Sequence, residues 1–367
     1  MTVDIRRPSF NVQRPRYRVR GSTSEILAFA LSRQKKKFIR QSAISNLDVV
    51  CLGEILIDFV PSPALSPLGE ARNLRIAPGG APANVAVALR RLGLLSGFIG
   101  KAGDDPFGRF LCGELAKQKI DLTLFELTPA AQTRLAFVTN DSNERQRFVF
   151  YGNPGADTLL DSREIEGDYL RRTKILHFGS ISLIQEPARS ATITAIDVAR
   201  ENGLMVSFDP NLRPALWPSL ELARQEILKV LKFCHILKVN KSEWEFLFPG
   251  RRFEESLALL WKRGIKLASV TLGADGALLA SHRSYVKVAS PRVVAVDSTG
   301  TGDGFVAGLL HGVLTGENQE LQFEEMELRK MARLATCVGA LTATKPGAIP
   351  AFPSLRQVKA FLRKSND

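Results

Sequence analysis

The 367-residue chain has few of the residues that build metal centres and disulfide frameworks. Its four cysteines stand far apart at positions 51, 112, 234 and 337, and its four histidines form no ligand cluster with them. This spacing excludes a disulfide framework and a Cys/His metal site, and it is typical of buried thiols in a reducing compartment. No apolar run approaches the roughly 18 residues that span a membrane, so we expect no membrane partner.

Two common phosphate-binding motifs are also absent. The chain contains neither a G-x-x-x-x-G-K-[ST] loop nor an H-R-D catalytic loop. Any phosphoryl chemistry would therefore need a different phosphate cradle.

The net charge of +13 is concentrated near the N-terminus. Residues 1–46 hold 11 Lys and Arg against 2 Asp and Glu, a net of +9, and the rest holds 39 against 35, a net of +4. A body with so small an excess is not expected to bind nucleic acid. The arm fits a transit peptide, which would place the protein in a plastid, a basic arm for an anionic partner, or a disordered extension, with the cytosol as the alternative location.

The most informative stretch is 297–305, which reads Asp-Ser-Thr-Gly-Thr-Gly-Asp-Gly-Phe. It follows a β-branched run over 285–296 and precedes an apolar helical pattern from 305, so we expect a strand-to-helix turn. Glycines let backbone N–H groups converge there, and a helix N-terminus adds a positive dipole end. Such a turn binds anions, most often phosphate, and Asp303 beside it could act as a general base. The alternative is a glycine turn in which Asp303 only caps the helix.

The rest of the chain alternates strand-like and helix-like segments. Strands are expected at 48–54, 96–100, 174–178, 205–209, 235–240 and 267–272, with a hairpin over 278–288. This pattern predicts an α/β fold, with a mainly parallel central sheet covered by helices on both faces. Ligands bind at the carboxyl ends of such strands, where Asp209, Asn240, Gly273 and the 297–303 turn all fall.

Two further segments carry polar or glycine residues in an apolar setting. Asp58 interrupts the apolar run 56–60, where an acid is either paired or functional, or else faces the surface. Gly79 and Gly80 admit close approach of a ligand, and Asn84 stands near a helix start. The strand-like segments 135–139 and 147–151 form a hairpin, which we assign to a small sheet separate from the main body.

Short motifs follow one another along residues 47–363: Gly53-Glu54, DFVP at 58–61, GGAPANVA at 79–86, GKAGDDPFG at 100–108, NPGAD at 153–157, FDPNLR at 208–213, KVNKSE at 238–243, TLGADG at 271–276, the 297–303 turn and KPGAIP at 345–350. Each alone is weak, but in this order they resemble the PfkB, or ribokinase-like, carbohydrate kinases, particularly plant-type fructokinases. The resemblance implies a three-layer ribokinase-like domain over 47–363, with a small β-sheet lid built from elements around 56–76 and 133–158 that closes over the sugar and excludes water.

The resemblance also implies an activity and its residues. It implies ATP-dependent transfer of the γ-phosphate to D-fructose, giving fructose 6-phosphate, so a sugar and ATP are the expected partners and Mg²⁺ and K⁺ the expected ions. Asp303 matches the general base, and Gly300, Thr301 and Gly302 match the anion hole. The remaining matches are Asp58, Gly79, Gly80 and Asn84 for the sugar; Asn240, Thr271, Gly273 and Gly276 for the nucleotide; Glu243 for magnesium; and Asp297, Thr299 and Gly347 for a monovalent cation.

Three positions depart from the family pattern. Thr301 replaces a smaller residue, Gly304 replaces a larger or hydroxyl residue, and Gly152 stands where plant fructokinases usually carry Arg, which puts lid closure and fructose affinity in doubt. One alternative function is therefore a PfkB kinase for another small sugar or nucleoside. A second is a weakly active fructokinase-like protein that serves as a partner in an organellar nucleic-acid complex. A homodimer is the candidate assembly.

Overall fold

The computed structural model describes residues 46–62, 71–140, 146–316 and 320–364. The described residues all belong to one compact unit, Ser45–Asp367. The basic extension predicted over 1–46 lies, except for its last residue, outside the described residues. All that follows concerns this unit.

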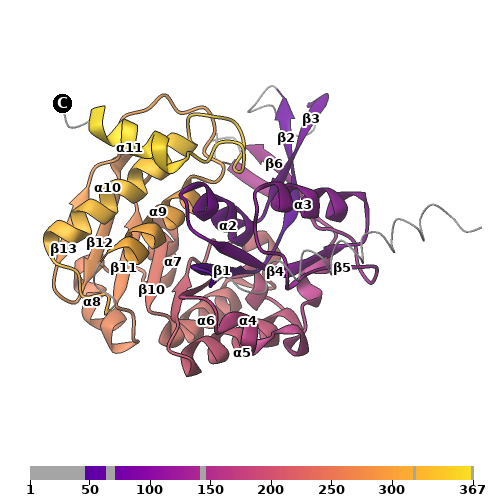
Figure 1. Cartoon of the computed structure of the whole chain (residues 1–367), viewed down its shortest axis with the longest axis horizontal. Helices are drawn as coiled ribbons and strands as arrows, with labels where there is room; N and C mark the ends of the chain where they lie inside the picture. The colour runs from indigo at the N-terminus through magenta and orange to yellow at the C-terminus, as the bar shows by residue number, and fades with distance from the viewer. Residues whose placement is uncertain (1–45, 63–70, 141–145, 317–319, 365–367) are drawn as a thin grey trace, which may run out of the picture. The chain divides into compact units, whose positions relative to one another are not determined.

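A long, mostly parallel sheet forms the centre of this unit (Figure 1). In the described residues it has nine strands in the order β13-β12-β11-β10-β9-β8-β1-β4-β5. Every pair from β5 through β11 is parallel, and β12 and β13 add an antiparallel edge. The strands are β1 (Val49–Leu52), β4 (Ser96–Gly103), β5 (Phe125–Thr128), β8 (Ile175–Phe178), β9 (Met205–Phe208), β10 (Ile236–Asn240), β11 (Leu267–Thr271), β12 (Ala277–Ser281) and β13 (Tyr285–Val288).

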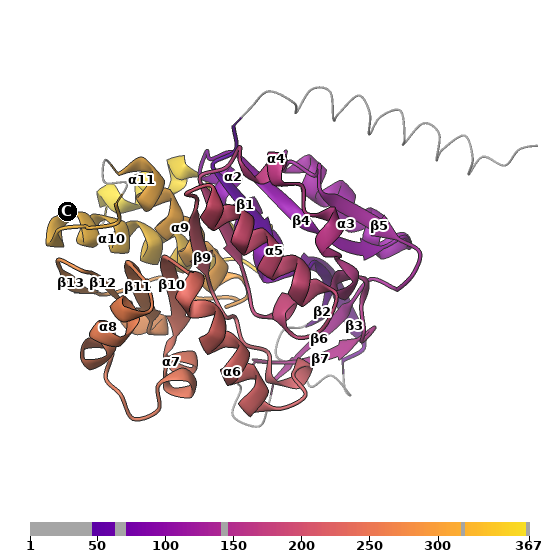
Figure 2. The ribbon, with the colours of Figure 1, turned by 90° about the horizontal axis from the view of Figure 1, so that it is seen from below.

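Helices cover both faces of this sheet, as Figures 1 and 2 show. Alternate side chains of β1 enter opposite cores: Val49 and Cys51 pack with α2, α9 and α10, whereas Val50 and Leu52 pack with α5, α6 and α8. A strand buried on both sides needs a continuous apolar sequence, which explains the run at 49–52. The helices are α2 (Ala81–Arg91), α3 (Pro106–Lys117), α4 (Gly167–Leu170), α5 (Ala188–Glu201), α6 (Leu220–Val230), α7 (Lys241–Leu247), α8 (Phe253–Lys262), α9 (Thr301–Thr315), α10 (Glu325–Thr342) and α11 (Leu355–Lys364).

A second, smaller sheet has the strand order β3-β2-β6-β7. Its strands are β2 (Leu56–Ser62), β3 (Asn73–Gly79), β6 (Leu135–Asn140) and β7 (Gln146–Tyr151). Its register places Asp58, Ala136 and Phe150 in one row across three strands, and the next row holds Ile76, Phe59, Phe137 and Val149. Because neighbouring rows point to opposite faces, one face of this sheet carries Asp58 and the other is apolar.

The predicted fold class is confirmed, and two local boundaries were wrong. The run at 285–296 was expected to lead as a strand into the glycine turn, but β13 ends at Val288. The helix expected from Phe305 begins at Thr301, so Asp303 lies in its first turn. Among the described helices, none is both long and apolar enough to cross a membrane.

Helices α9 and α10 approach each other along a line of glycines. A Cβ atom on Gly304 would lie 2.8 Å from Oγ1 of Thr342, and one on Gly308 would lie 2.7 Å from Cα of Ala335. Such distances leave no room for a side chain, so glycine is needed for this packing. The departure at Gly304 therefore has a structural cause in the contact with α10.

Candidate active site

A cleft of about 510 Å³ opens at the carboxyl ends of the parallel strands, between the main sheet and the small sheet. The small sheet lines it with Asp58, Ala136 and Phe150, and the main body with the first turn of α9 and the loops after β9, β10 and β11. Strand β1 lies between β4 and β8, so the chain builds the sheet outward from β1 in both directions, and the strand order reverses there; this is the switch point where α/β folds place ligands.

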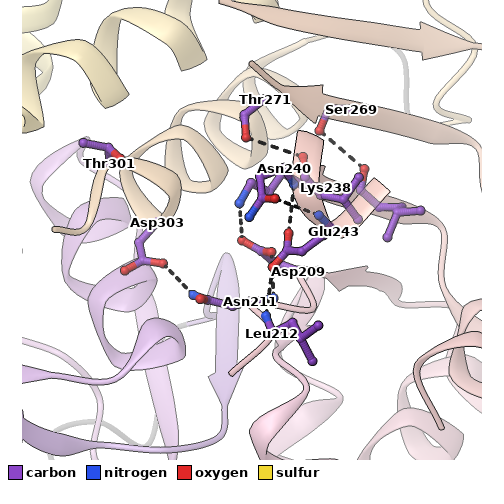
Figure 3. A network of polar contacts seen from close by, with 12 residues as sticks. Asp209, Asn211, Leu212, Lys238, Asn240, Glu243, Ser269, Thr271, Thr301 and Asp303 are labelled. Carbon is purple, nitrogen blue, oxygen red and sulfur yellow. Dashed lines mark hydrogen bonds and ion pairs between the residues drawn. The ribbon is translucent and has the colours of Figure 1, made fainter. Parts of the chain in front are cut away.

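Asp303 is buried in this cleft and held by two amides. Nδ2 of Asn84, on α2, donates to Oδ2 of Asp303 at 2.9 Å. Nδ2 of Asn211 donates to Oδ1 at 3.3 Å, as Figure 3 shows. Asn211 has a φ of +43°, a region that asparagine tolerates better than most residues, and it follows β9 directly. Burial raises the pKa of Asp303 to about 6, against the opposing effect of the Asn84 hydrogen bond.

The turn before Asp303 has the glycine-rich backbone from which an anion site was predicted. Gly300 has a φ of +78°, and a Cβ atom there would lie 2.6 Å from Cβ of Ala348. Thr301, Gly302 and Asp303 form the first turn of α9, where N–H groups lack partners within the helix. The Thr301 hydroxyl donates to the Ser298 carbonyl at 2.9 Å, so its side chain is tied to the turn.

Lys238 lies beside this turn, although the sequence analysis gave it no role. A Cβ atom on Gly302 would lie 3.1 Å from Nζ of Lys238, which also donates to Oδ2 of Asp209 at 2.8 Å. Both side chains of this pair are almost fully buried. Burial disfavours the charge on Lys238, but the carboxylates of Asp209, Glu243 and Asp303 together outweigh it and raise the pKa of the lysine. A fixed cation thus stands next to the predicted anion hole.

Glu243 serves the backbone in this structure. Oε2 accepts from the Asn240 N–H at 2.8 Å and Oε1 from the Leu212 N–H at 2.8 Å, while the Asn240 side chain accepts from the Glu243 N–H at 2.8 Å. This capping box begins α7 and holds the loop after β9. Both carboxylate oxygens are therefore engaged, and no group of three metal-ligating side chains is found among the described residues.

Of the residues predicted to bind the nucleotide, some line the cleft and one has a structural role. Thr271 and Gly273 line the cleft, as Asn240 does. Gly276 does not line it; a Cβ atom there would lie 2.0 Å from the Val288 carbonyl oxygen, so this glycine is required by the approach of β13. The φ of +97° at Gly276 adds to that requirement.

The small sheet supplies Asp58 to the opposite wall. Burial raises the pKa of Asp58 to about 7, against the opposing charge of Arg213. A Cβ atom on Gly79 would lie 2.2 Å from Oδ2 of Asp58, so the glycine makes room for the carboxylate, whereas Gly80 lines the cleft itself. Glu54 also lines the cleft: Oε1 accepts from the Ala81 N–H at 2.8 Å, and Oε2 is buried with no hydrogen-bond partner among the described residues.

Arg213 connects the two sheets across the cleft. Its guanidinium carbon lies 4.8 Å from the ring centroid of Phe148 on β7, and Nη1 donates to the carbonyls of Asn211 and Leu212. This cation–π contact joins the loop that carries Asn211 to the small sheet.

The predicted cation-site residues lie together beside the cleft. Oδ1 of Asp297 accepts from N and Oγ1 of Thr299 at 2.8 and 2.6 Å, and Oδ2 accepts from the Gly347 N–H at 2.7 Å. Arg75, on β3, adds Nη2 at 3.9 Å from Oδ2. Asp297 therefore connects its own loop to the loop that contains Gly347, and it lies close to the positive charge of Arg75 from the small sheet.

Gly152, the third departure, does not line the cleft. Its φ is +72°, and the nearest atom to a Cβ placed there is the Thr133 carbonyl oxygen at 3.4 Å. The position therefore has space for a side chain but a backbone conformation that favours glycine.

The residues without an assigned role had weak sequence signals. Lys238 interrupts the apolar run of β10, and an ionisable residue at such a position is a sequence signal for a buried, oppositely charged partner. Asn211 and Arg213 stand in the FDPNLR motif directly after β9. Glu54 follows Gly53 at the end of β1, and nothing local distinguishes it from an exposed loop acid.

The carboxyl edge of this α/β sheet carries a carboxylate that can accept a proton, and a cation and N–H groups that can stabilise phosphate charge. Kinases that act on small molecules need these groups for phosphoryl transfer. The family model for "pfkB family carbohydrate kinase" matches residues 46–355. The chain belongs to this family.

Individual relatives agree with that membership. The chain is 45% identical over 316 residues to the probable fructokinase-2 of Arabidopsis thaliana, which covers 86% of this chain and 95% of that protein. The crystal structure of a Xylella fastidiosa fructokinase with bound ATP superimposes with a TM-score of 0.80 at 30% identity, covering 87% of this chain and 99% of that one. A double mutant of Vibrio cholerae fructokinase, bound to fructose, ADP and potassium ion, gives a TM-score of 0.76 at 34% identity, covering 87% and 99%.

Proposed function

We propose that the protein transfers the γ-phosphoryl group of ATP to a hydroxyl of D-fructose, giving fructose 6-phosphate and ADP. The observation that carries this proposal is the placement of the buried Asp303 carboxylate between two amide donors, in the first turn of α9 and beside Lys238. The naming of its relatives as fructokinases supports fructose as the acceptor.

Each residue has a defined part in the reaction. Asp303 takes the proton from the attacking hydroxyl, whose oxygen forms a bond to the γ-phosphorus while the bond from that phosphorus to the ADP oxygen breaks. The N–H groups at the start of α9 and the Lys238 ammonium stabilise the charge on the transferring group. Asp58, Gly80 and Asn84 orient the sugar, and Asn240, Thr271 and Gly273 line the nucleotide side of the cleft.

The two implied ions fit the residues differently. The described carboxylates offer no three-residue magnesium site, and both oxygens of Glu243 are engaged, so Mg²⁺ is best placed as an ion carried by the ATP phosphates. It would neutralise phosphate charge there. For K⁺, we propose the loops joined by Asp297 and Gly347, with the potassium-bound Vibrio relative as support.

The outer face of the small sheet supports the proposed homodimer. Ile76 is 49% exposed and Tyr151 57% exposed, with Leu74 and Val149 exposed beside them. Apolar side chains gathered on one sheet face are typical of an interface between protein chains. Light scattering at several protein concentrations measures the assembly; a monomer throughout would contradict the proposal.

The activity is tested with a panel of sugars and nucleosides, using the natural protein and the Asp303→Asn variant. We expect fructose to be the preferred acceptor and the variant to lose ~10²–10⁴-fold in turnover with its ATP affinity retained. Preference for another acceptor would support the alternative sugar or nucleoside kinase. No phosphorylation of any acceptor would overturn the kinase proposal and favour the partner role.

A further inference from the structure

A second cavity lies at the opposite, amino-terminal edge of the main sheet. It has a volume of about 280 Å³ and is lined by residues at the starts of three adjacent parallel strands: Met205 begins β9, His235 precedes β10 and Lys266 precedes β11. The other lining residues are Arg200, from the last turn of α5, Gly203, Leu204 and the buried Leu321. It shares no lining residue with the cleft that contains Asp303.

The polar side chains that line this cavity are two cations, Arg200 and Lys266, and one imidazole, His235. The Arg200 guanidinium carbon is fixed 5.0 Å from the ring centroid of Phe233. Nδ1 of His235 accepts the Val206 N–H at 3.0 Å, so in the neutral ring the proton is on Nε2, which becomes a donor. Burial first, and then the charges of Lys266 and Arg200, lower the pKa of His235, which keeps the ring neutral.

The positive charge of the cavity is not compensated within the described part of the chain. None of the described residues that line it is acidic. Neither Arg200 nor Lys266 has an ion pair among those residues. The same edge of the sheet pairs its cations elsewhere: Lys174, just before β8, meets Asp48 at 2.8 Å. Two cations close to one another, without a counter-charge, create a positive potential in the cavity. This potential lowers the pKa of the neighbouring imidazole and attracts an anion from solution.

We propose that this cavity binds a phosphate-bearing anion, held by Arg200, Lys266 and the Nε2–H of His235. A guanidinium, an ammonium and a neutral N–H together match the several acceptor oxygens of a phosphate group. Such a group could come from orthophosphate or from a phosphate ester, and the volume admits a small ester. The inference does not depend on the sugar that the other cleft accepts.

The test is calorimetric titration of the full chain with sodium phosphate, and separately with glycerol 3-phosphate. A saturating non-hydrolysable ATP analogue and fructose are present throughout, so that the anion hole of α9 is filled. The test variant is Arg200→Gln/Lys266→Gln, and the matched control is Lys262→Gln, an exposed lysine of α8 that does not line the cavity.

We expect the natural protein and the control to bind, and the double variant to lose at least about tenfold in affinity. Tighter binding of glycerol 3-phosphate assigns the site to an ester, and equal binding assigns it to orthophosphate. Absence of binding by the natural protein, or equal binding by the double variant, overturns the proposal. The melting temperature of the double variant, expected to be unchanged or higher because two like charges are removed, shows that any loss of binding is local.

Discussion

Asn84 and Asp303 stand 219 residues apart in the sequence and meet at 2.9 Å, so the starts of two helices, α2 and α9, fix one carboxylate. A donor on a carboxylate stabilises its ionised form, whereas burial opposes ionisation. In Asp303 burial prevails, and its pKa is raised to about 6. The group is thus close to the pH at which a base works best.

The first prediction is that kcat/KM for fructose falls as the pH drops through about 6, because Asp303 must be ionised to accept a proton. Asp58, whose pKa is raised to about 7, lies in the same cleft and steepens the fall. Asn84→Ala removes a hydrogen bond that favours the carboxylate, so we expect the inflection to move to higher pH. Initial rates between pH 5 and 9 measure this; an inflection that moves down would contradict the assigned role of Asn84.

The second prediction is that Asp303→Asn stabilises the folded protein at neutral pH. Because folding raises the pKa of Asp303 from 3.8 to about 6, its ionisation costs stability above that range, on the order of 2–3 kcal/mol at most. Asparagine does not ionise, although it loses the acceptor for Asn211. Urea unfolding should therefore show a gain at pH 8 that disappears near pH 4. An equal loss of unfolding free energy at both pH values would show that burial of the ionised carboxylate does not destabilise the natural protein.

The third prediction separates structure from chemistry at Lys238. Lys238→Met alone leaves Asp209 buried and unpaired, which costs about 3–5 kcal/mol of unfolding free energy. Asp209→Leu/Lys238→Met replaces both charges and should recover most of that loss. Its kcat should stay at least ~10²-fold low, because the cation beside Gly302 is missing. Near-normal turnover in the stable double variant would limit Lys238 to a structural role.

The fourth prediction concerns Gly152. The φ of +72° makes Gly152→Arg cost roughly 1–2 kcal/mol, and the position does not line the cleft. We therefore expect the KM for fructose to change less than about twofold, or 0.4 kcal/mol. Gly152→Ala is the matched control and should show the same loss of stability. A markedly lower KM in the arginine variant alone would show that the side chain reaches the sugar.

The sequence predicted the layers of the fold because buried parallel strands must be apolar on both faces, as at Val49 to Leu52. It misplaced the start of α9, because glycines at 300, 302 and 304 are typical of a loop, although Gly300 is the N-cap and Gly302 and Gly304 lie in the first helical turn. It predicted the hairpin strand to Val288 correctly, but it also expected the run through Val294 and Val296 to lead as a strand into the glycine turn, because β-branched side chains fit a strand. Ser290-Pro291 interrupts that run, and proline has no N–H for a ladder.

The site was predicted where motif order carried it, and missed where a contact depends on how distant segments pack. Asp303 and Asn84 stand in recognisable motifs, and they do meet. The contact of Arg75 with Asp297 depends on the position of the small sheet, and the role of Glu243 depends on the path of the loop at Leu212. No pattern within either segment carries that information, because it arises only in the packed tertiary structure.

The close contact of α9 with α10 has a consequence for biosynthesis. Gly304 lies one residue after Asp303, and the atoms that pack against it belong to Val338 and Thr342, near the end of the chain. The ribosome therefore synthesises α9 before α10, so the helix that carries Asp303 gains this covering layer only after α10 has been made. A released chain truncated after residue 324 should therefore remain open to proteolysis around α9, whereas the chain that includes α10 should be protected; protection of the truncated chain would show that α9 packs stably without α10.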